Sequence, residues 1–173
     1  NDIFIETIQK TFKILQFCKN KKIDLISSLS ARTQLNTHYG RHRKACEIII
    51  DTGKNLIVRL GPMYGGKRTL DSIHDILFNR TVYISGKTKY AYVDVAYSAK
   101  KIIDLIDEKG IFEVGAKNGI ELDEIKNYFK SDCVFEGYDD TQIPINPPND
   151  APDAKEVLMF CEQKLKDIKR LSS

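Results

Sequence analysis

The sequence predicts a mixed α+β domain, and three observations support this fold class. Apolar residues recur every three or four positions near both ends of the chain, which is typical of amphipathic helices. β-Branched runs flank glycine-containing turns near residues 45–60 and 81–96, which indicates two β-hairpins. The 173 residues, 42% of them hydrophobic, are enough to bury one core. We therefore predict a single domain over residues 1–173, with a mixed sheet of two hairpins, packing helices and a long C-terminal helix.

The first sixty residues predict two helices and then the first hairpin. Residues 2–18 carry apolar side chains at helical spacing, and a second helix is expected from about Asp24 toward Tyr39. Residues 45–50 and 55–60 are expected to pair across a turn that contains Gly53. A helix through Ile48–Ile50 is the competing interpretation, but three adjacent isoleucines favour a strand.

The remainder of the chain predicts a second hairpin among helices. Thr69 is expected to cap a short helix, and Gly86-Lys87 to turn the hairpin of residues 81–96. Ser98 is expected to cap the next helix. The remaining expected elements are a strand over 111–114, a helix over 121–130, a proline-rich loop over 137–152 and a last helix over 152–171. The chain begins without Met, so we expect it to be a fragment of a longer protein.

Composition and charge narrow the class of protein. The four cysteines are far apart, so we expect reduced, mostly buried thiols in a cytoplasmic protein. We expect no membrane contact, because no apolar run is long enough to cross a bilayer. Residues 1–100 hold 17 Lys and Arg against 8 Asp and Glu, a balance of +9. Residues 101–173 hold 10 against 16, a balance of −6, so we expect the first half to face an anionic partner.

A glycine-rich stretch, Leu60–Thr69, lies between a predicted strand and a predicted helix. This order of elements is a common way to hold phosphate, because backbone N–H groups at the helix start point at the anion. Gly65 and Gly66 would supply N–H groups, and Lys67 and Arg68 positive charge. A nucleoside-triphosphate P-loop requires Ser or Thr where Arg68 stands, so the stretch predicts a phosphate contact without triphosphatase chemistry.

Cations and aromatic residues elsewhere in the basic half suggest a nucleic-acid surface. Cations bind the phosphate backbone, and tyrosine rings stack on bases. Tyr39 and Tyr64 are the predicted stacking residues. With the glycine-rich stretch, the predicted phosphate contacts are Arg41, Arg43, Lys44, Arg59, Gly65, Gly66, Lys67, Arg68 and Arg80.

The best enzymatic interpretation of the sequence is a metal-dependent nuclease. Asp75 precedes the second predicted hairpin and Asp94 lies on its second strand, an order that resembles restriction-type nucleases. In such sites carboxylates hold a divalent metal, here Mg²⁺, and a lysine orients the attacking water. Ala96 stands where that lysine is required, so Lys100, or its neighbour Lys101, is the expected substitute.

These observations predict a domain that binds a phosphate-bearing partner, most of all nucleic acid. If the domain is an enzyme, we expect it to be a metal-dependent nuclease. A nucleotide or cyclic-nucleotide sensor is one alternative. An interaction module of a larger protein, acting through its acidic C-terminal helix, is another. Self-association and flanking domains stay open as further partners.

Overall fold

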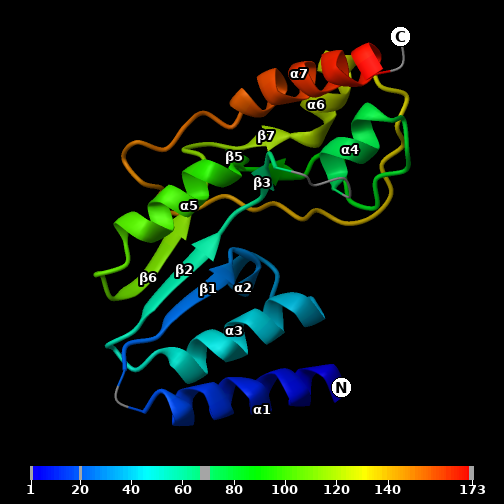
Figure 1. Ribbon diagram of the computed structural model, residues 1–173. Coiled ribbons are helices and arrows are strands. Elements are labelled where there is room, and N and C mark those ends of the chain that lie inside the picture. Colours follow the sequence, from blue (N-terminus) through cyan, green and yellow to red (C-terminus); the bar gives the residue numbers. More distant parts are fainter. Residues whose placement is uncertain (1, 20, 67–70, 172–173) are drawn as a thin grey trace. The chain divides into compact units, whose positions relative to one another are not determined.

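The computed structural model describes residues 2–19, 21–66 and 71–171, and it shows a mixture of helices and strands (Figure 1). The predicted mixed helix-and-strand class is therefore confirmed. The elements are α1 (Asp2–Phe17), β1 (Asp24–Ser28), α2 (Ser30–Thr33), α3 (His38–Ile50), β2 (Leu56–Leu60), β3 (Met63–Tyr64), α4 (Ser72–Leu77), β4 (Lys89–Tyr90), β5 (Val93–Asp94), α5 (Val95–Asp104), β6 (Gly110–Val114), β7 (Ile120–Glu121), α6 (Leu122–Phe129) and α7 (Glu156–Leu171).

The chain forms two compact units. Unit 1 comprises Asn1–Leu60 and Ala99–Val114, and unit 2 comprises Gly61–Ser98 and Gly115–Ser173. The single domain over residues 1–173 stays a prediction.

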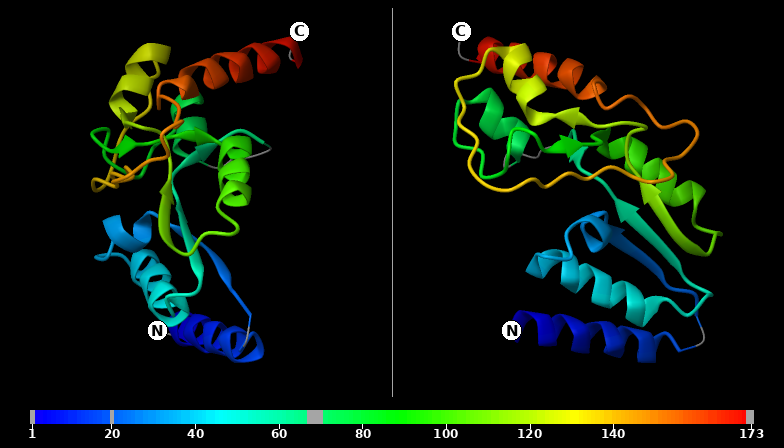
Figure 2. Two further views of the ribbon diagram at one scale, coloured as in Figure 1. Left: turned by 90° about the vertical axis from the view of Figure 1, so that its left-hand side faces the viewer. Right: turned by 180° about the vertical axis from the view of Figure 1, so that it is seen from behind.

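Unit 1 is a layered structure around a parallel sheet. Its three strands follow the order β1-β2-β6, and both pairings are parallel. Helix α3 packs on β1, and α1 packs on the opposite side of α3, as Figure 1 and the right-hand view of Figure 2 show. The central strand explains the sheet's stability, because Leu56, Ile57 and Val58 are almost fully buried. A continuous apolar run of this kind is typical of a parallel strand covered on both faces.

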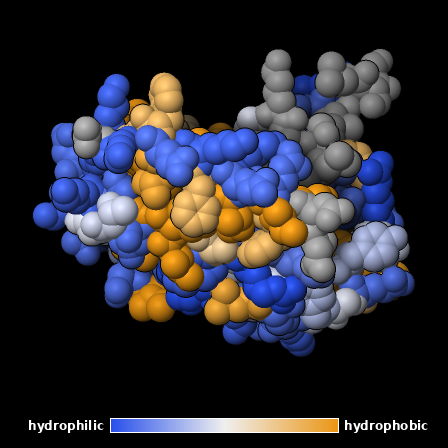
Figure 3. Space-filling model, turned by 90° about the horizontal axis from the view of Figure 1, so that it is seen from below, coloured by the Kyte–Doolittle hydropathy of each residue, from blue (hydrophilic) through white to orange (hydrophobic). Residues whose placement is uncertain are grey.

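Helix α1 confirms the predicted amphipathic helix. It turns Ile8 and Leu15 inward, where both are partly buried, and leaves Ile3, Ile14 and Phe17 more than half exposed. Figure 3 looks onto this side of unit 1 and shows apolar side chains interrupted by hydrophilic ones. The helix therefore presents a mixed surface rather than a uniformly polar one.

The predicted hairpin over residues 45–60 does not form, because residues 45–50 belong to α3. The helix begins at the N-cap Thr37, whose hydroxyl accepts a hydrogen bond from the N–H group of Gly40 at 3.0 Å. Cys46, Glu47 and Ile50 are buried at helical spacing. The helix that competed with the strand at Ile48–Ile50 is therefore the observed structure, since capping and a buried stripe outweigh the weaker helix preference of isoleucine.

The predicted helix from Asp24 toward Tyr39 is also wrong. The segment instead forms β1, the four-residue α2 and the start of α3. Each residue of β1 pairs in register with one of β2, from Asp24 with Leu56 to Ser28 with Leu60. This pairing joins residues about thirty positions apart, so the local spacing of apolar residues does not reveal it.

Unit 2 gathers short strand pairs and three helices around its own core. β3 pairs in parallel with β5, and β4 pairs in antiparallel fashion with β7. The predicted hairpin over residues 81–96 is therefore absent, because its segments pair with more distant partners. The central apolar residues of this unit are fully or almost fully buried: Ile73, Ile76, Val93, Ile120, Leu122, Ile125, Val157 and Cys161. The long C-terminal helix predicted for the fold is present as α7.

The proline-rich segment 137–152 contains no helix and no multi-residue strand among the described residues. A buried polar cluster fixes part of it: the hydroxyl of Tyr90 donates a hydrogen bond to Asp140, and the amide of Gln142 donates another at 3.1 Å. Burial raises the pKa of the Asp140 carboxyl above its usual range, because it disfavours the charged form. The irregular segment is thus anchored by side chains rather than by a backbone ladder.

The four cysteines are unpaired, and most of them are buried. Cys46, Cys133 and Cys161 are buried and Cys18 is partly exposed, which confirms the expectation of mostly buried side chains. No helix in the described part of the chain is long and apolar enough to cross a bilayer. The cytoplasmic location stays a prediction.

Candidate functional site

A row of polar side chains crosses the sheet of unit 1 near the ends of its strands. Ser27 on β1 pairs in register with Arg59 on β2, which pairs in register with Glu113 on β6. Residues paired in this way project to the same face of a sheet. Each lies next to the last residue of its strand, so the row marks the carboxyl edge of the sheet. In open α/β sheets this edge is where ligands bind.

Arg59 is the centre of a buried ionic network. Its guanidinium donates two hydrogen bonds to Glu47 of α3, at 2.9 and 2.7 Å, and a third to Glu113 at 3.1 Å. The hydroxyl of Ser27 donates to Glu47 at 2.7 Å. These bonds to Glu47, first among several causes, raise the pKa of Arg59 above its usual value.

Arg32 of α2 completes this network from the other side. It holds Glu113 with two hydrogen bonds, at 2.8 and 3.0 Å, in the paired geometry that a guanidinium and a carboxylate favour. Glu47 is only 1% exposed, so its charge is acceptable only because donors surround it. The network is therefore an anchor that fixes α2 and α3 against the carboxyl edge of the sheet.

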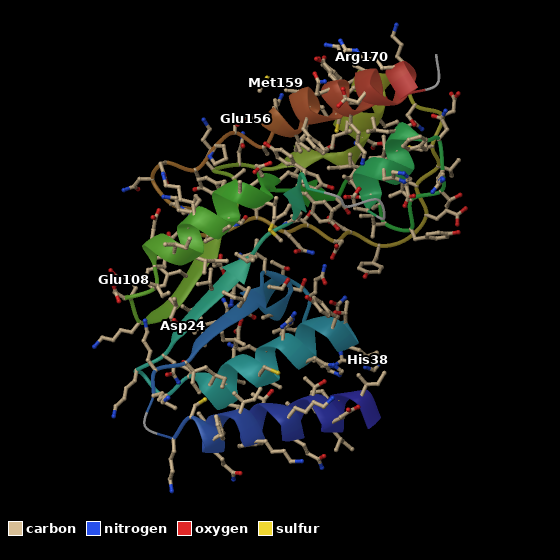
Figure 4. All side chains as sticks on the ribbon, in the orientation of Figure 1. Asp24, His38, Glu108, Glu156, Met159 and Arg170 are labelled. Atoms are coloured by element: carbon tan, nitrogen blue, oxygen red, sulfur yellow. The ribbon has the colours of Figure 1, made fainter. Side chains whose placement is uncertain are left out.

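The anchor sets the orientation of a second pair of side chains on α3. Tyr39, Arg43 and Glu47 are spaced by four residues, so they lie along one side of the helix. Glu47 points into the network, which turns Tyr39 and Arg43 toward the same side. Helix α3 runs opposite to β1: His38 at its start and Asp24 at the start of β1 lie at opposite ends of unit 1 (Figure 4). Tyr39 therefore lies at the carboxyl edge of the sheet.

Gly40 allows the start of α3 to approach α2 closely. A Cβ atom at this position would lie 2.1 Å from the carbonyl oxygen of Gln34 and 2.6 Å from that of Ser30. Both atoms belong to the backbone, so neither can rotate away. The absence of a side chain at Gly40 thus decides how near Tyr39 comes to the edge of the sheet.

Tyr39 and Arg43 form a pair that can receive a ligand. The Nε atom of Arg43 donates a hydrogen bond to the hydroxyl of Tyr39 at 3.2 Å, and its guanidinium lies 5.4 Å from the centre of the tyrosine ring. Tyr39 is 51% exposed, so its hydroxyl is accessible. A cation beside a hydroxyl stabilises negative charge on an oxygen atom bound there. Sequence reasoning assigned the two residues to separate tasks and missed the network, although the four-residue spacing from Tyr39 to Glu47 was the signal for one face.

The other predicted cations of unit 1 have local partners. Arg41 donates to the carbonyl oxygens of Leu35 and Asn36, at 3.2 and 2.9 Å. The Nζ atom of Lys44 lies 3.7 Å from Glu47. Arg59 is buried in the network, so its side chain is committed to the protein interior. Arg41 and Lys44 thus make contacts close to their own helix, whereas Arg59 holds the buried network together.

The glycine-rich stretch lies in unit 2. Gly65 and Gly66 adopt positive φ angles of 98° and 64°, which glycine tolerates best. Tyr64 is buried, and its ring packs on Phe160 with centroids 5.2 Å apart, so it presents no open face for stacking. Arg80 lies over the ring of Phe78, at 5.8 Å. Lys67 and Arg68, with the predicted cap Thr69, lie outside the described residues, and the observed cap of α4 is Asp71.

The predicted nuclease centre gains no support from the geometry. Asp94 accepts a hydrogen bond from the N–H group of Ala96 at 2.7 Å, at the start of α5, and Asp75 lies within α4. Lys100 belongs to unit 1, whereas both aspartates belong to unit 2. No group of three or more metal-binding side chains occurs within residues 2–19, 21–66 and 71–171. The expectation of Mg²⁺ is therefore withdrawn.

Comparisons with known proteins identify the fold. No protein-family model matches the chain, and no curated protein matches it. Among solved structures, the enzyme WbmG of Bordetella bronchiseptica, in complex with NAD and UDP, has a TM-score of 0.63 at 15% identity, over 92% of this chain and 65% of that one. A UDP-glucuronic acid 4-epimerase from Bacillus cereus, bound to UDP-glucuronic acid and NAD, has a TM-score of 0.57 at 15% identity, over 89% and 61%.

A third similar structure is a hypothetical dTDP-4-dehydrorhamnose reductase from Sulfolobus tokodaii, with a TM-score of 0.59 at 16% identity, over 89% of this chain and 64% of that one. The chain thus spans less than two thirds of the length of these three structures. It shares a Rossmann-like fold with these structures, with a parallel sheet in unit 1.

The likeness corrects the function predicted from the sequence. Nucleic-acid binding with nuclease activity is wrong, because the similar structures are nucleotide-sugar epimerases and reductases rather than nucleases. The sensor and interaction-module alternatives gain no support from these matches. A nucleotide-type partner, the coarser part of the prediction, agrees with them, since the similar structures bind UDP or nucleotide sugars.

These 173 residues contain no glycine-rich turn of the kind that holds the diphosphate of NAD. That group is held by a G-x-G-x-x-G turn between a strand and a helix, where the glycines let the backbone approach the phosphates. The pattern occurs nowhere in the 173 residues. The turn from β1 to α2 is made by Leu29, which is fully buried and not a glycine. We therefore derive no step through NAD.

Proposed function

We propose that this chain binds a nucleotide sugar, and that Tyr39 and Arg43 contact its sugar at the carboxyl edge of the sheet of unit 1. The observation that carries the proposal is the exposed Tyr39–Arg43 pair, set at this edge by the buried Glu47–Arg59 network. The fold supports the choice of ligand, because several similar structures hold UDP or UDP-sugars.

The pair suits the chemistry of a sugar. A sugar hydroxyl both donates and accepts hydrogen bonds, and so does the hydroxyl of tyrosine. The Arg43 guanidinium carries further N–H donors besides the one that contacts Tyr39, and these are available to a second sugar oxygen. Tyr39 and Arg43 thus provide three kinds of contact. The tyrosine hydroxyl both donates and accepts a hydrogen bond, the guanidinium only donates, and the tyrosine ring offers an apolar edge.

The charge near the pair suits a diphosphate. The first half of α3 carries His38, Arg41, His42, Arg43 and Lys44 without an acidic residue. The start of a helix adds a partial positive charge of about half a unit. A nucleoside diphosphate, with two or more negative charges, is attracted to such a helix start, whereas a neutral sugar alone is not. The proposal concerns binding of the nucleotide sugar by the residues of unit 1.

Isothermal titration calorimetry with UDP-glucose and with UDP tests the proposal on the full chain. Tyr39→Phe removes one hydroxyl from the sugar contact, and one hydrogen bond contributes about 0.5–1.5 kcal/mol, so we expect UDP-glucose to bind roughly 2- to 10-fold more weakly. UDP should bind equally well to the wild type and to Tyr39→Phe, because it lacks the glucose that Tyr39 contacts. Tyr83→Phe is the matched control, since Tyr83 is 74% exposed in unit 2.

Two outcomes would overturn the proposal. One is the absence of measurable binding of UDP-glucose to the wild-type chain. The other is an equal affinity for UDP-glucose in the wild type, Tyr39→Phe and Tyr83→Phe, which would place the sugar away from Tyr39.

A further inference from the structure

A hollow lies at the end of the sheet of unit 1 that is opposite to Tyr39. It has a volume of about 540 Å³ and is lined by the end of α1, the segment before β1 and the segment before β2. The lining residues are Leu15, Cys18, Lys19, Lys21, Lys22, Thr52, Lys54 and Asn55. Asp24, labelled in Figure 4, marks the start of β1 and hence this end of the sheet. Tyr39 lies at the other end, so this lysine pocket is distinct from the sugar contact.

The lysine pocket is strongly positive. Four of its eight lining residues are lysines, and none is acidic. Lys22 is partly neutralised, because its ammonium lies 3.3 Å from Asp24 and also donates to the carbonyl oxygen of Ile106. Lys19, Lys21 and Lys54 form no salt bridge with any described residue. Three lysines from two different segments therefore line one hollow without a salt-bridge partner among the described residues.

The ends of two nearby helices do not neutralise this charge. Helices α1 and α3 end at Phe17 and Ile50, close in sequence to the lining residues, and a helix end carries a partial negative charge of about half a unit. Two such ends offset about one positive charge, which leaves about two of the three unpaired ammonium groups uncompensated. Clustered lysines repel one another, so the arrangement is most stable when an anion is bound.

Neutral groups at the floor of the pocket are already ordered. The amide of Asn55 donates to the carbonyl oxygen of Ile50 and to the hydroxyl of Thr52 at 3.0 Å, and its oxygen accepts from the N–H group of Ile23 at 2.9 Å. Thr52 accepts that bond, so its own proton is free to be donated to a ligand. Asn55 is 5% exposed and ties both lysine-bearing segments together. The pocket is thus lined by hydrogen-bonded neutral groups as well as by lysines.

We propose that the lysine pocket binds the diphosphate group of a small molecule. A volume of this size is typical of small-ligand sites and too small for a folded partner. Lysine binds phosphate as a point charge, and a diphosphate distributes several negative charges over a length that ammonium groups from two segments can reach. Inorganic pyrophosphate is the minimal probe, and UDP tests whether an attached nucleoside is tolerated.

Alkylation of Cys18 reports occupancy of the pocket. Cys18 lines it and is the partly exposed thiol, whereas the other three cysteines are buried. The rate of its reaction with iodoacetamide, an uncharged reagent, is followed by mass spectrometry of the full chain with and without pyrophosphate, at ionic strength matched with sodium chloride. We expect saturating pyrophosphate to slow the reaction about fivefold or more, since a bound ligand covers the thiol.

Substitution of two lining lysines tests the charges directly. In Lys21→Gln/Lys54→Gln the protection by pyrophosphate should fall to less than about twofold, because two of three unpaired cations are gone. Protection is the rate of Cys18 alkylation without pyrophosphate divided by the rate with it, measured in the same variant. A change in the intrinsic reactivity of the Cys18 thiol therefore cancels. Lys13→Gln/Lys100→Gln removes the same charge from exposed lysines outside the pocket and should retain protection.

Three results would overturn the proposal: no protection of the wild type by pyrophosphate or UDP, equal protection by sodium chloride alone, or equal loss of protection in the two double variants. The first would show that no diphosphate binds, and the others that only general screening is at work. Tyr39→Phe should leave protection unchanged, so the result is independent of the sugar contact.

Discussion

At the residue scale, Glu47 is the side chain on which the site depends. It is almost fully buried and receives donors from Arg59 and Ser27, while Arg59 also contacts Glu113. A buried charge that loses one partner costs several kcal/mol, because the remaining charge keeps its desolvation penalty. The network is thus a rigid support for α3 rather than a set of free cations for a phosphate backbone.

Glu47→Gln should destabilise the protein by about 2–3 kcal/mol, because Arg59 loses its main counter-charge while Glu113 still pairs with it. Urea unfolding followed by circular dichroism measures the change. Glu6→Gln is the matched control and should leave the unfolding midpoint unchanged, since Glu6 pairs with Lys10 on the exposed side of α1. A stability equal to that of the wild type in Glu47→Gln would contradict the anchoring role.

At the element scale, α3 shows why a local sequence pattern can mislead. The adjacent isoleucines Ile48–Ile50 predict a strand, whereas they form the end of this helix. The strand preference of isoleucine is a local bias, and it is overridden by the Thr37 cap and by burial at helical spacing. The strand β1 was missed because its stability comes from pairing with β2, which a local pattern cannot report.

Gly40→Ala tests the contact between α3 and α2. Alanine favours a helix by about 1 kcal/mol over glycine, so an unpacked helix would gain stability. Here the added Cβ meets backbone oxygens at 2.1 and 2.6 Å, and we expect a net loss of about 2 kcal/mol or more.

Thermal unfolding of Gly40→Ala measures this loss, with Gly53→Ala as the comparison. Gly53 has a φ angle of 72° but no atom within 4 Å of an added Cβ, so its cost reflects backbone strain alone, about 1–2 kcal/mol. A Gly40→Ala protein more stable than the wild type would show that α3 and α2 do not touch at this point.

At the scale of the whole molecule, the mixed fold and the basic first half were accessible from the sequence, and the function was not. The excess of cations indicated an anionic partner but not its chemistry, because nucleic acid and a nucleotide sugar both carry phosphate. The pair Asp75 and Asp94 suggested a metal site only while the hairpin of residues 81–96 was assumed. The parallel sheet and the Tyr39–Arg43 pair at its carboxyl edge require the three-dimensional structure.

The most direct test of the central claim is a crystal structure of the full chain with UDP-glucose bound. The account predicts a sugar hydroxyl within hydrogen-bonding distance of the Tyr39 hydroxyl, about 2.6–3.2 Å, beside the Arg43 guanidinium at the carboxyl edge of the sheet. A bound UDP-glucose whose sugar lies away from Tyr39 and Arg43 would contradict it.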